Sequence, residues 1–142
     1  MKHPFVATAQ VTIHAPLTTV WNALIDPAMI KQYLFGTQAI SDWKVGSSIA
    51  YKGEWEGKTY EDKGVILALE PEKLLKSTYW SSFSGTADSP EIYNTVTYAL
   101  SSDGDQTILT ITQDNIVDEA KRNHSQGNWT MVLHTLKKLL ET

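Results

Sequence analysis

The sequence predicts an α+β fold in which a strongly curved antiparallel sheet of about seven strands wraps around one long C-terminal helix. Two observations support this prediction. One strand-like segment precedes two short helical segments, and six strand-like segments then precede a long amphipathic one. Seven strands spaced about 4.8 Å apart span on the order of 34 Å, whereas a helix is about 10 to 12 Å wide. One helix cannot cover a flat sheet of that width, so we expect a curled sheet with a cavity where sheet and helix diverge.

The N-terminal segment predicts one strand and two short helices. Residues 6–13 alternate between polar and apolar side chains, as in a half-buried strand that ends before Pro16. The next segment has an apolar helical face, with Thr18 or Thr19 as its expected N-terminal cap. The dipeptide Asp26-Pro27 should end this helix and begin a second one that reaches about residue 34.

The middle of the chain is typical of an antiparallel meander. Short alternating segments are separated by turn-forming residues at 56–58, 70–72 and 102–105. The stretch 81–91 is rich in serine and is the longest expected loop, a kind of segment that often carries function. The predicted strands cover residues 38–42, 47–55, 59–70, 73–81, 91–100 and 105–114.

The last segment predicts a long helix that begins after a capping Asp118. Its C-terminal half has an apolar stripe, formed by Trp129, Val132, Leu133, Leu136 and Leu140. The same face carries Ser125, Arg122, Lys121 and Asp118 in the N-terminal half. That half should therefore either overhang into water or border a polar space. Gly127 costs a helix about 1 kcal/mol relative to alanine, so we expect something to approach closely there.

Bulk properties exclude several classes of protein. The 142 residues fit one domain, 1–142, and the formal net charge of −4 with scattered lysine and arginine argues against nucleic-acid binding. No apolar run approaches the roughly 20 residues of a membrane span. The sequence has no cysteine and no recognisable secretory signal at its start, so we expect a cytoplasmic protein.

Three segments resemble a known family: "APLTTVWNALIDPAMIKQYLFGT", "SDWKVGSSIAYKGEWEGKTYEDKGVILALEPEKLLKSTYWS" and "GNWTMVLHTLKKLLE". They are similar to homologues of the C-terminal domain of Aha, the activator of the heat-shock-protein-90 ATPase, within the SRPBCC or START-like superfamily. The resemblance implies the helix-grip fold of the birch-pollen allergen. It also implies a cavity between sheet and long helix that commonly takes hydrophobic or amphipathic small molecules. The eukaryotic co-chaperone makes much of its chaperone contact through a separate N-terminal domain that this sequence does not include.

The aromatic residues of the middle strands and the polar half of the last helix are the candidate ligand-binding residues. Aromatic rings would supply contact area, and His124 with Asn128 would orient the ligand. Core packing is the competing explanation for each aromatic side chain. The candidates are Tyr51, Trp55, Tyr60, Trp80, Tyr98, His124, Asn128 and Trp129.

Carboxylates gather around the predicted hairpin at 56–58, but lysines are interleaved with them, so we expect a solvated face there. The carboxylates are Glu54, Glu56, Glu61 and Asp62, and the lysines are Lys52, Lys58 and Lys63.

No pattern in the sequence predicts catalysis, a metal site or a cofactor. It contains no HExxH motif, glycine-rich phosphate loop, nucleophile elbow or paired-acid signature. The sequence therefore favours a binding protein for a small hydrophobic or amphipathic molecule, acting as a monomer or homodimer. One alternative is a module that binds a chaperone or another protein. An enzyme of the cyclase or hydrolase kind is a weaker alternative that rests on fold analogy alone.

Overall fold

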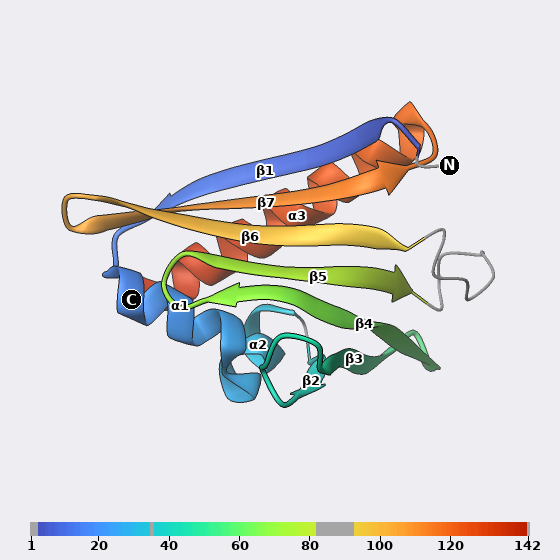
Figure 1. The fold of residues 1–142 in the computed structure, drawn as a ribbon, viewed down its shortest axis with the longest axis horizontal. Helices are drawn as coiled ribbons and strands as arrows, with labels where there is room; N and C mark the ends of the chain where they lie inside the picture. Colours follow the sequence, from blue (N-terminus) through green and yellow to red (C-terminus); the bar gives the residue numbers. More distant parts are fainter. Residues whose placement is uncertain (1–2, 35, 82–92, 142) are drawn as a thin grey trace.

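The computed structural model describes residues 3–34, 36–81 and 93–141, except for the side chain of Trp55 (Figure 1). The strands are β1 (Phe5–Ile13), β2 (Gln38–Ser41), β3 (Ser48–Trp55), β4 (Lys58–Glu70), β5 (Leu74–Ser81), β6 (Asn94–Asp103) and β7 (Gln106–Ile116). The helices are α1 (Leu17–Ile25), α2 (Pro27–Tyr33) and α3 (Glu119–Leu140). Neighbouring strands pair antiparallel in one 7-stranded sheet, in the order β1-β7-β6-β5-β4-β3-β2.

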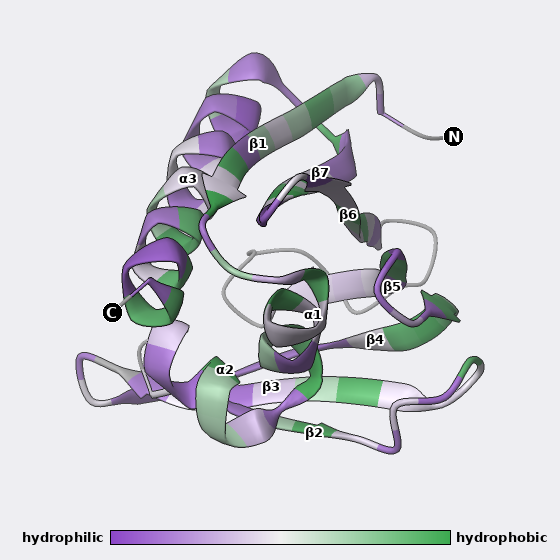
Figure 2. Ribbon diagram, turned by 90° about the vertical axis from the view of Figure 1, so that its left-hand side faces the viewer, coloured by the Kyte–Doolittle hydropathy of each residue, from purple (hydrophilic) through white to green (hydrophobic). Residues whose placement is uncertain are grey.

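The sheet curls around α3, which confirms the predicted architecture. Figure 2 shows the strands curving from β1 at the top to β2 at the bottom, with α3 on the concave side. The helix packs mainly on β1 and makes fewer contacts with β7. The short helices α1 and α2 lie at one end of the concave space (Figure 2).

Alternation along the strands places one set of side chains on the concave face. On β7 and β6 these include Leu109, Ile111, Val96 and Leu100, all buried. The stripe of α3 closes over this face, with Val132, Leu133 and Leu136 buried in the same apolar cluster. The core therefore lies between the sheet and the C-terminal half of α3, with Trp21 of α1 also buried in it.

Two expectations about element ends are wrong. The first helix begins at Leu17, and Pro16 occupies the cap position without a side-chain hydrogen bond. Thr18 lies inside the helix, where its hydroxyl donates to Glu72 instead of capping. Strand β6 runs to Asp103 rather than ending at residue 100, because a tight turn at Gly104, with φ +65°, lets Asp103 pair with Gln106. The serine-rich stretch lies outside the described residues from 82 to 91.

The close approach expected at Gly127 is not made by any described residue. A Cβ added at Gly127 would meet no atom of the described residues within 4 Å, and the residue is exposed. The glycine therefore weakens the helix without making room for a neighbour.

Candidate functional site

A cavity of about 940 Å³ lies between the sheet and the N-terminal half of α3. Strands β3 to β7 line it on one side and the polar half of α3 on the other. The α3 residues at the cavity are Lys121, His124, Ser125, Asn128, Trp129 and Val132. The polar half of α3 thus borders a cavity instead of only overhanging into water, although the cavity wall also contains many apolar side chains.

Small side chains in the middle of the sheet leave this volume unfilled. Ser77 on β5 pairs in register with Val96 on β6, and both are buried residues of the concave face that line the cavity. The adjacent Gly64 presents no side chain at all. An added Cβ there would lie 1.8 Å from the backbone oxygen of Thr78, so no other residue fits without moving β5. Side chains this short cannot reach the helix.

Aromatic rings form much of the cavity wall. Tyr98 and Trp129 meet edge to face, with ring centroids 6.1 Å apart. The indole nitrogen of Trp129 donates to Gln113 Oε1 at 2.8 Å, which fixes the ring against β7. Tyr51 and Tyr79 complete the wall on β3 and β5. Burial raises the pKa of Tyr51, Tyr79 and Tyr98, so these hydroxyls stay neutral and can donate hydrogen bonds.

Asp62 places a partly buried carboxyl group among these rings, whereas Glu54, which also lines the cavity, is exposed. Tyr79 donates to its Oδ2 atom at 3.1 Å, and Ser81 also hydrogen-bonds to it. Its Oδ1 atom is buried and has no hydrogen-bond partner in the part of the chain that the structure describes. Burial raises the pKa of Asp62, and the hydroxyls of Ser81 and Tyr79 lower it in part.

A chain of amide side chains forms a second polar corner at the β6 and β7 side. Gln113 Nε2 donates to Asn94 Oδ1 at 3.1 Å, and Asn94 Nδ2 donates to the backbone oxygen of Asp114 at 2.7 Å. Asn115 donates to the backbone oxygen of Tyr93 at 3.1 Å. These contacts satisfy one another, so this corner is pre-organised without a ligand.

The predicted ligand-binding residues, apart from Trp55, all line the cavity. They are Tyr51, Tyr60, Trp80, Tyr98, His124, Asn128 and Trp129. The side chain of Trp55 lies outside what the structure describes.

These residues differ in how they meet the cavity. Tyr60 lies over Gly53, and its hydroxyl is hydrogen-bonded to Thr37. Trp80 pairs with Lys63 and lies under that ammonium at 5.5 Å, so alternation places its ring on the strand face opposite to Tyr79. His124 and Asn128 are exposed and contact each other at 3.2 Å.

Asp62 is not among the predicted ligand-binding residues, because the surrounding charges predicted a solvated face. In the structure, acidic residues of this region lie on two opposite faces of the sheet. Glu61 pairs with Lys52 at 3.3 Å on the exposed side, whereas Asp62 turns inward. Every second residue back from the buried Ile66 is Gly64 and then Asp62. The alternation of strand residues therefore predicts that Asp62 faces inward, although the charge pattern predicted a solvated face.

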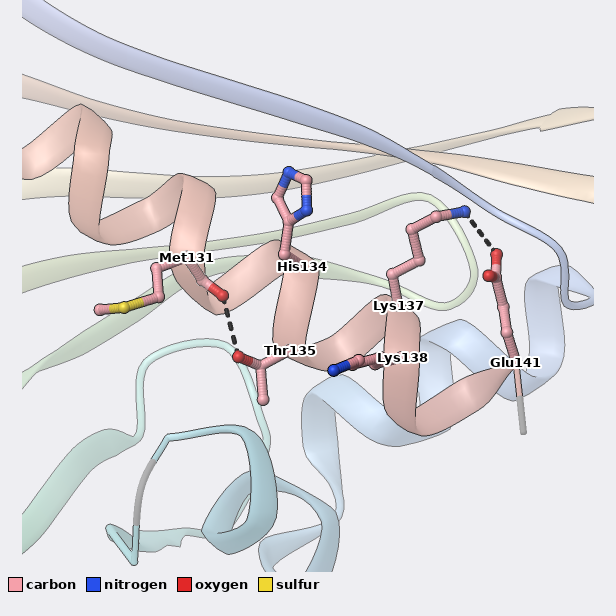
Figure 3. Close-up of a pocket in the computed structure, with 6 residues that line it drawn as sticks. All are labelled: Met131, His134, Thr135, Lys137, Lys138 and Glu141. Carbon is pink, nitrogen blue, oxygen red and sulfur yellow. Dashed lines mark hydrogen bonds and ion pairs between the residues drawn. The ribbon is translucent and has the colours of Figure 1, made fainter.

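A second, smaller hollow of about 400 Å³ runs along the C-terminal half of α3 (Figure 3). Figure 3 shows Lys137 directed to Glu141, and their charged groups are 2.6 Å apart. This ion pair lowers the pKa of Glu141, as does the backbone N–H of His14. All the lining residues belong to or directly follow one helix, so the hollow is a surface groove. They are Met131, His134, Thr135, Lys137, Lys138 and Glu141.

The described residues contain neither a metal-binding cluster nor a helix suited to cross a membrane. No group of three or more His, Cys, Asp or Glu side chains is placed to hold a metal ion. No helix in residues 3–34, 36–81 or 93–141 combines the length and the apolar content that crossing a bilayer requires.

Comparison with known proteins identifies the family. The solution structure of a protein from Cytophaga hutchinsonii is 43% identical, with a TM-score of 0.85 over 99% of this chain and 97% of its own. The Aha1 dimer of Colwellia psychrerythraea is 20% identical, with a TM-score of 0.77 over 96% of both chains. A protein of the dynemicin biosynthetic locus is 19% identical, with a TM-score of 0.81 over 96% of this chain and 47% of its own.

The last two likenesses show a shared fold alone. No curated protein matches the sequence. The family profile described as "Activator of Hsp90 ATPase homolog 1-like protein" matches residues 14–141. This match confirms the resemblance that the sequence suggested. The chain belongs to the Activator of Hsp90 ATPase homolog 1-like protein family.

Proposed function

We propose that the protein binds a small hydrophobic or amphipathic molecule in the cavity between the sheet and α3. The observation that carries this proposal is the volume of about 940 Å³, bordered by Tyr51, Tyr98 and Trp129. Ligand sites typically have a volume of about 300 to 1,000 Å³, mostly apolar walls and a few placed polar groups. Tyr98 and Trp129 supply the apolar contact, and Asp62 and Gln113 supply polar groups.

The wall of the cavity is built before any ligand arrives. Gln113 holds Trp129, and Tyr98 meets the edge of that indole ring. A pre-organised wall reduces the entropy that binding would otherwise lose in ordering side chains. The ordered wall therefore supports the interpretation of the cavity as a binding site and not as a packing defect without function.

Titration with Nile red, a neutral apolar dye whose fluorescence rises in apolar surroundings, tests the proposal. We expect saturable binding to the wild type. Ser77→Phe should weaken the affinity at least tenfold, because the ring enters the cavity from the middle of the sheet. Thr97→Phe is the matched control, since alternation places Thr97 on the convex face of β6. We expect its affinity to stay within twofold of the wild type.

Two results would contradict the proposal. Nile red that fails to saturate would show no ligand-sized apolar site. Equal binding by the wild type and Ser77→Phe would place the dye elsewhere on the protein. Circular dichroism on both variants distinguishes a blocked cavity from an unfolded chain.

A protein partner is the second candidate function, and the family description favours it. That description names activation of a chaperone ATPase, and one relative of the same fold is a dimer. Capture of a heat-shock-protein-90 chaperone from cytoplasmic extract tests for a chaperone partner. The mass of the purified protein, measured by light scattering, tests for a second copy of this chain. Recovery of the protein in the cytoplasmic fraction of its host tests the predicted location.

A further inference from the structure

One buried oxygen of Asp62, Oδ1, has no hydrogen-bond partner in the described parts of the chain, and this restricts the class of molecule that the cavity can take. We propose, building on the ligand-binding function above, that the ligand has an apolar body with a hydrogen-bond donor, an ammonium or hydroxyl group, that binds Asp62 Oδ1. Asp62 is then the residue that determines which end of an amphipathic ligand lies against β4.

Asp62 occupies the centre of a row that crosses three strands. It pairs in register with Tyr51 on β3 and with Ser81 on β5. Side chains in such cross-strand pairs lie about 4.5 to 5.5 Å apart at Cβ, on the same face of the sheet. The row faces the cavity, and all three residues line it. The carboxyl group is thus held by the rigid part of the fold rather than by a loop.

The two oxygens of Asp62 have different surroundings. Tyr79 donates to Oδ2 at 3.1 Å, whereas Oδ1 is buried and has no hydrogen-bond partner among the described residues. A buried acceptor without a partner costs about 1 to 3 kcal/mol. A ligand that donates a hydrogen bond to Oδ1 removes this free-energy penalty. A ligand that offers only an acceptor does not remove it.

Among the described residues, no cationic side chain acts on the carboxyl group of Asp62 to lower its pKa. The influences that lower its pKa are the hydroxyls of Ser81 and Tyr79. The nearby Lys63 has its ammonium over the ring of Trp80. Hydrogen bonds between an ammonium and a carboxylate are roughly twice as strong as bonds between neutral groups. An ammonium should therefore bind better than a hydroxyl.

The rest of the cavity favours the same orientation. The faces of Tyr51, Tyr79 and Tyr98 can attract a cation that comes within about 6 Å of the ring centroid. Lys121 and His124 lie on the helix wall, and α3 packs on β1 and β7 rather than on β4. A cationic group would be repelled by Lys121, so the donor end of the ligand is directed to β4 and the apolar end towards Trp129.

Displacement of Nile red by three matched probes tests this proposal. Decylammonium, 1-decanol and decyl methyl ether share one apolar chain, and the ether alone among them lacks a donor. Nile red itself has no hydrogen-bond donor. For the wild type we expect decylammonium to displace the dye at the lowest concentration, 1-decanol next, and the ether at a concentration at least tenfold above decylammonium.

Variants at position 62 assign the selectivity to the carboxyl group. Asp62→Asn keeps the size and removes the charge, so decylammonium should lose its advantage over 1-decanol. Asp62→Leu removes the acceptor, so all three probes should act within about twofold of one another. Glu61→Gln is the matched control, because Glu61 lies on the opposite strand face and pairs with Lys52. It should keep the order found in the wild type.

The outcomes separate this proposal from the one it rests on. Saturable Nile red binding with no preference between ether, alcohol and ammonium would overturn the role of Asp62 alone. The same holds if the preference persists in Asp62→Leu. Absence of Nile red binding to the wild type would overturn both proposals together. If Asp62→Leu does not fold, Asp62→Asn still decides, since loss of the ammonium advantage supports the proposal and its persistence refutes it.

Discussion

The two halves of α3 belong to one helix but have opposite surroundings. The C-terminal half buries Val132, Leu133 and Leu136 against the sheet. The N-terminal half presents Lys121 and Ser125 to the cavity. Figure 2 shows this contrast as a change in the hydropathy of the ribbon along the helix. The length of the apolar stripe on α3 therefore determines where the core ends and where ligand-sized space begins.

The same division appears in the sheet. Opposite the C-terminal half, β7 offers Leu109 and Ile111. Opposite the N-terminal half, the concave face changes to Gln113 on β7 and Asn94 on β6. Polar residues at both walls could not have been buried against each other without satisfied hydrogen bonds. Keeping the two polar walls apart therefore costs less free energy than burying them against each other, and the space between them is the cavity.

The largest expected effect comes from breaking the packed half. Leu133→Ala removes a side chain that is 2% exposed and leaves a hole in a rigid core. We expect the free energy of unfolding to fall by about 2 to 5 kcal/mol. Ser125→Ala, two turns earlier on the cavity half, should change it by less than about 0.5 kcal/mol. Urea denaturation of the three proteins measures the contrast, and equal losses would show that the two halves are packed alike.

A change on the cavity side, at Asp62, should stabilise the protein instead of destabilising it. Burial raises the pKa of Asp62, so the folded protein holds this proton more tightly than the unfolded chain does. Between the unfolded value near 3.9 and the raised folded value, the folded state binds more protons. The free energy of unfolding therefore falls as pH rises through this window, and the loss remains above it.

Asp62→Asn removes that titration and keeps a group that can bond to Tyr79 and Ser81. We expect the variant to be more stable than the wild type at pH 7 by about 1 kcal/mol, and the difference to disappear below about pH 4. Glu61→Gln should stay within about 0.5 kcal/mol of the wild type, since its ion pair is exposed. A destabilised Asp62→Asn at neutral pH would mean that the ionised carboxylate is stabilised by the fold.

Much of the fold was predictable because it depends on local patterns. The predicted strand 59–70 matches β4 to within one residue at its start, since turn residues bound an alternating run. The predicted cap Asp118 does accept a hydrogen bond from the backbone N–H of Lys121 at 2.8 Å. Alternation and capping are properties of neighbours in sequence, so one sequence is enough to show them.

The candidate site was less predictable because it depends on which face each strand turns inward. Asp62 and Glu61 are adjacent and both acidic, and only the register with Tyr51 and Ser81 separates them. The β4–β5 register shifts between Ile66 and Ala68, so residues beyond that irregularity cannot be assigned a face by counting from the far end of the strand. No pattern in the sequence indicates the direction in which the Trp80 side chain points.

The smallest expected effect tests the cavity half of α3 itself, at Gly127. The residue is helical and exposed, and a Cβ there would meet no described atom within 4 Å. Gly127→Ala should therefore raise the free energy of unfolding by about 0.5 to 1 kcal/mol, since alanine loses less conformational freedom in a helix. Nile red affinity should stay within twofold, because Gly127 does not line the cavity. A gain in stability with reduced dye binding would instead mean that this half of the helix must bend or open to admit the ligand.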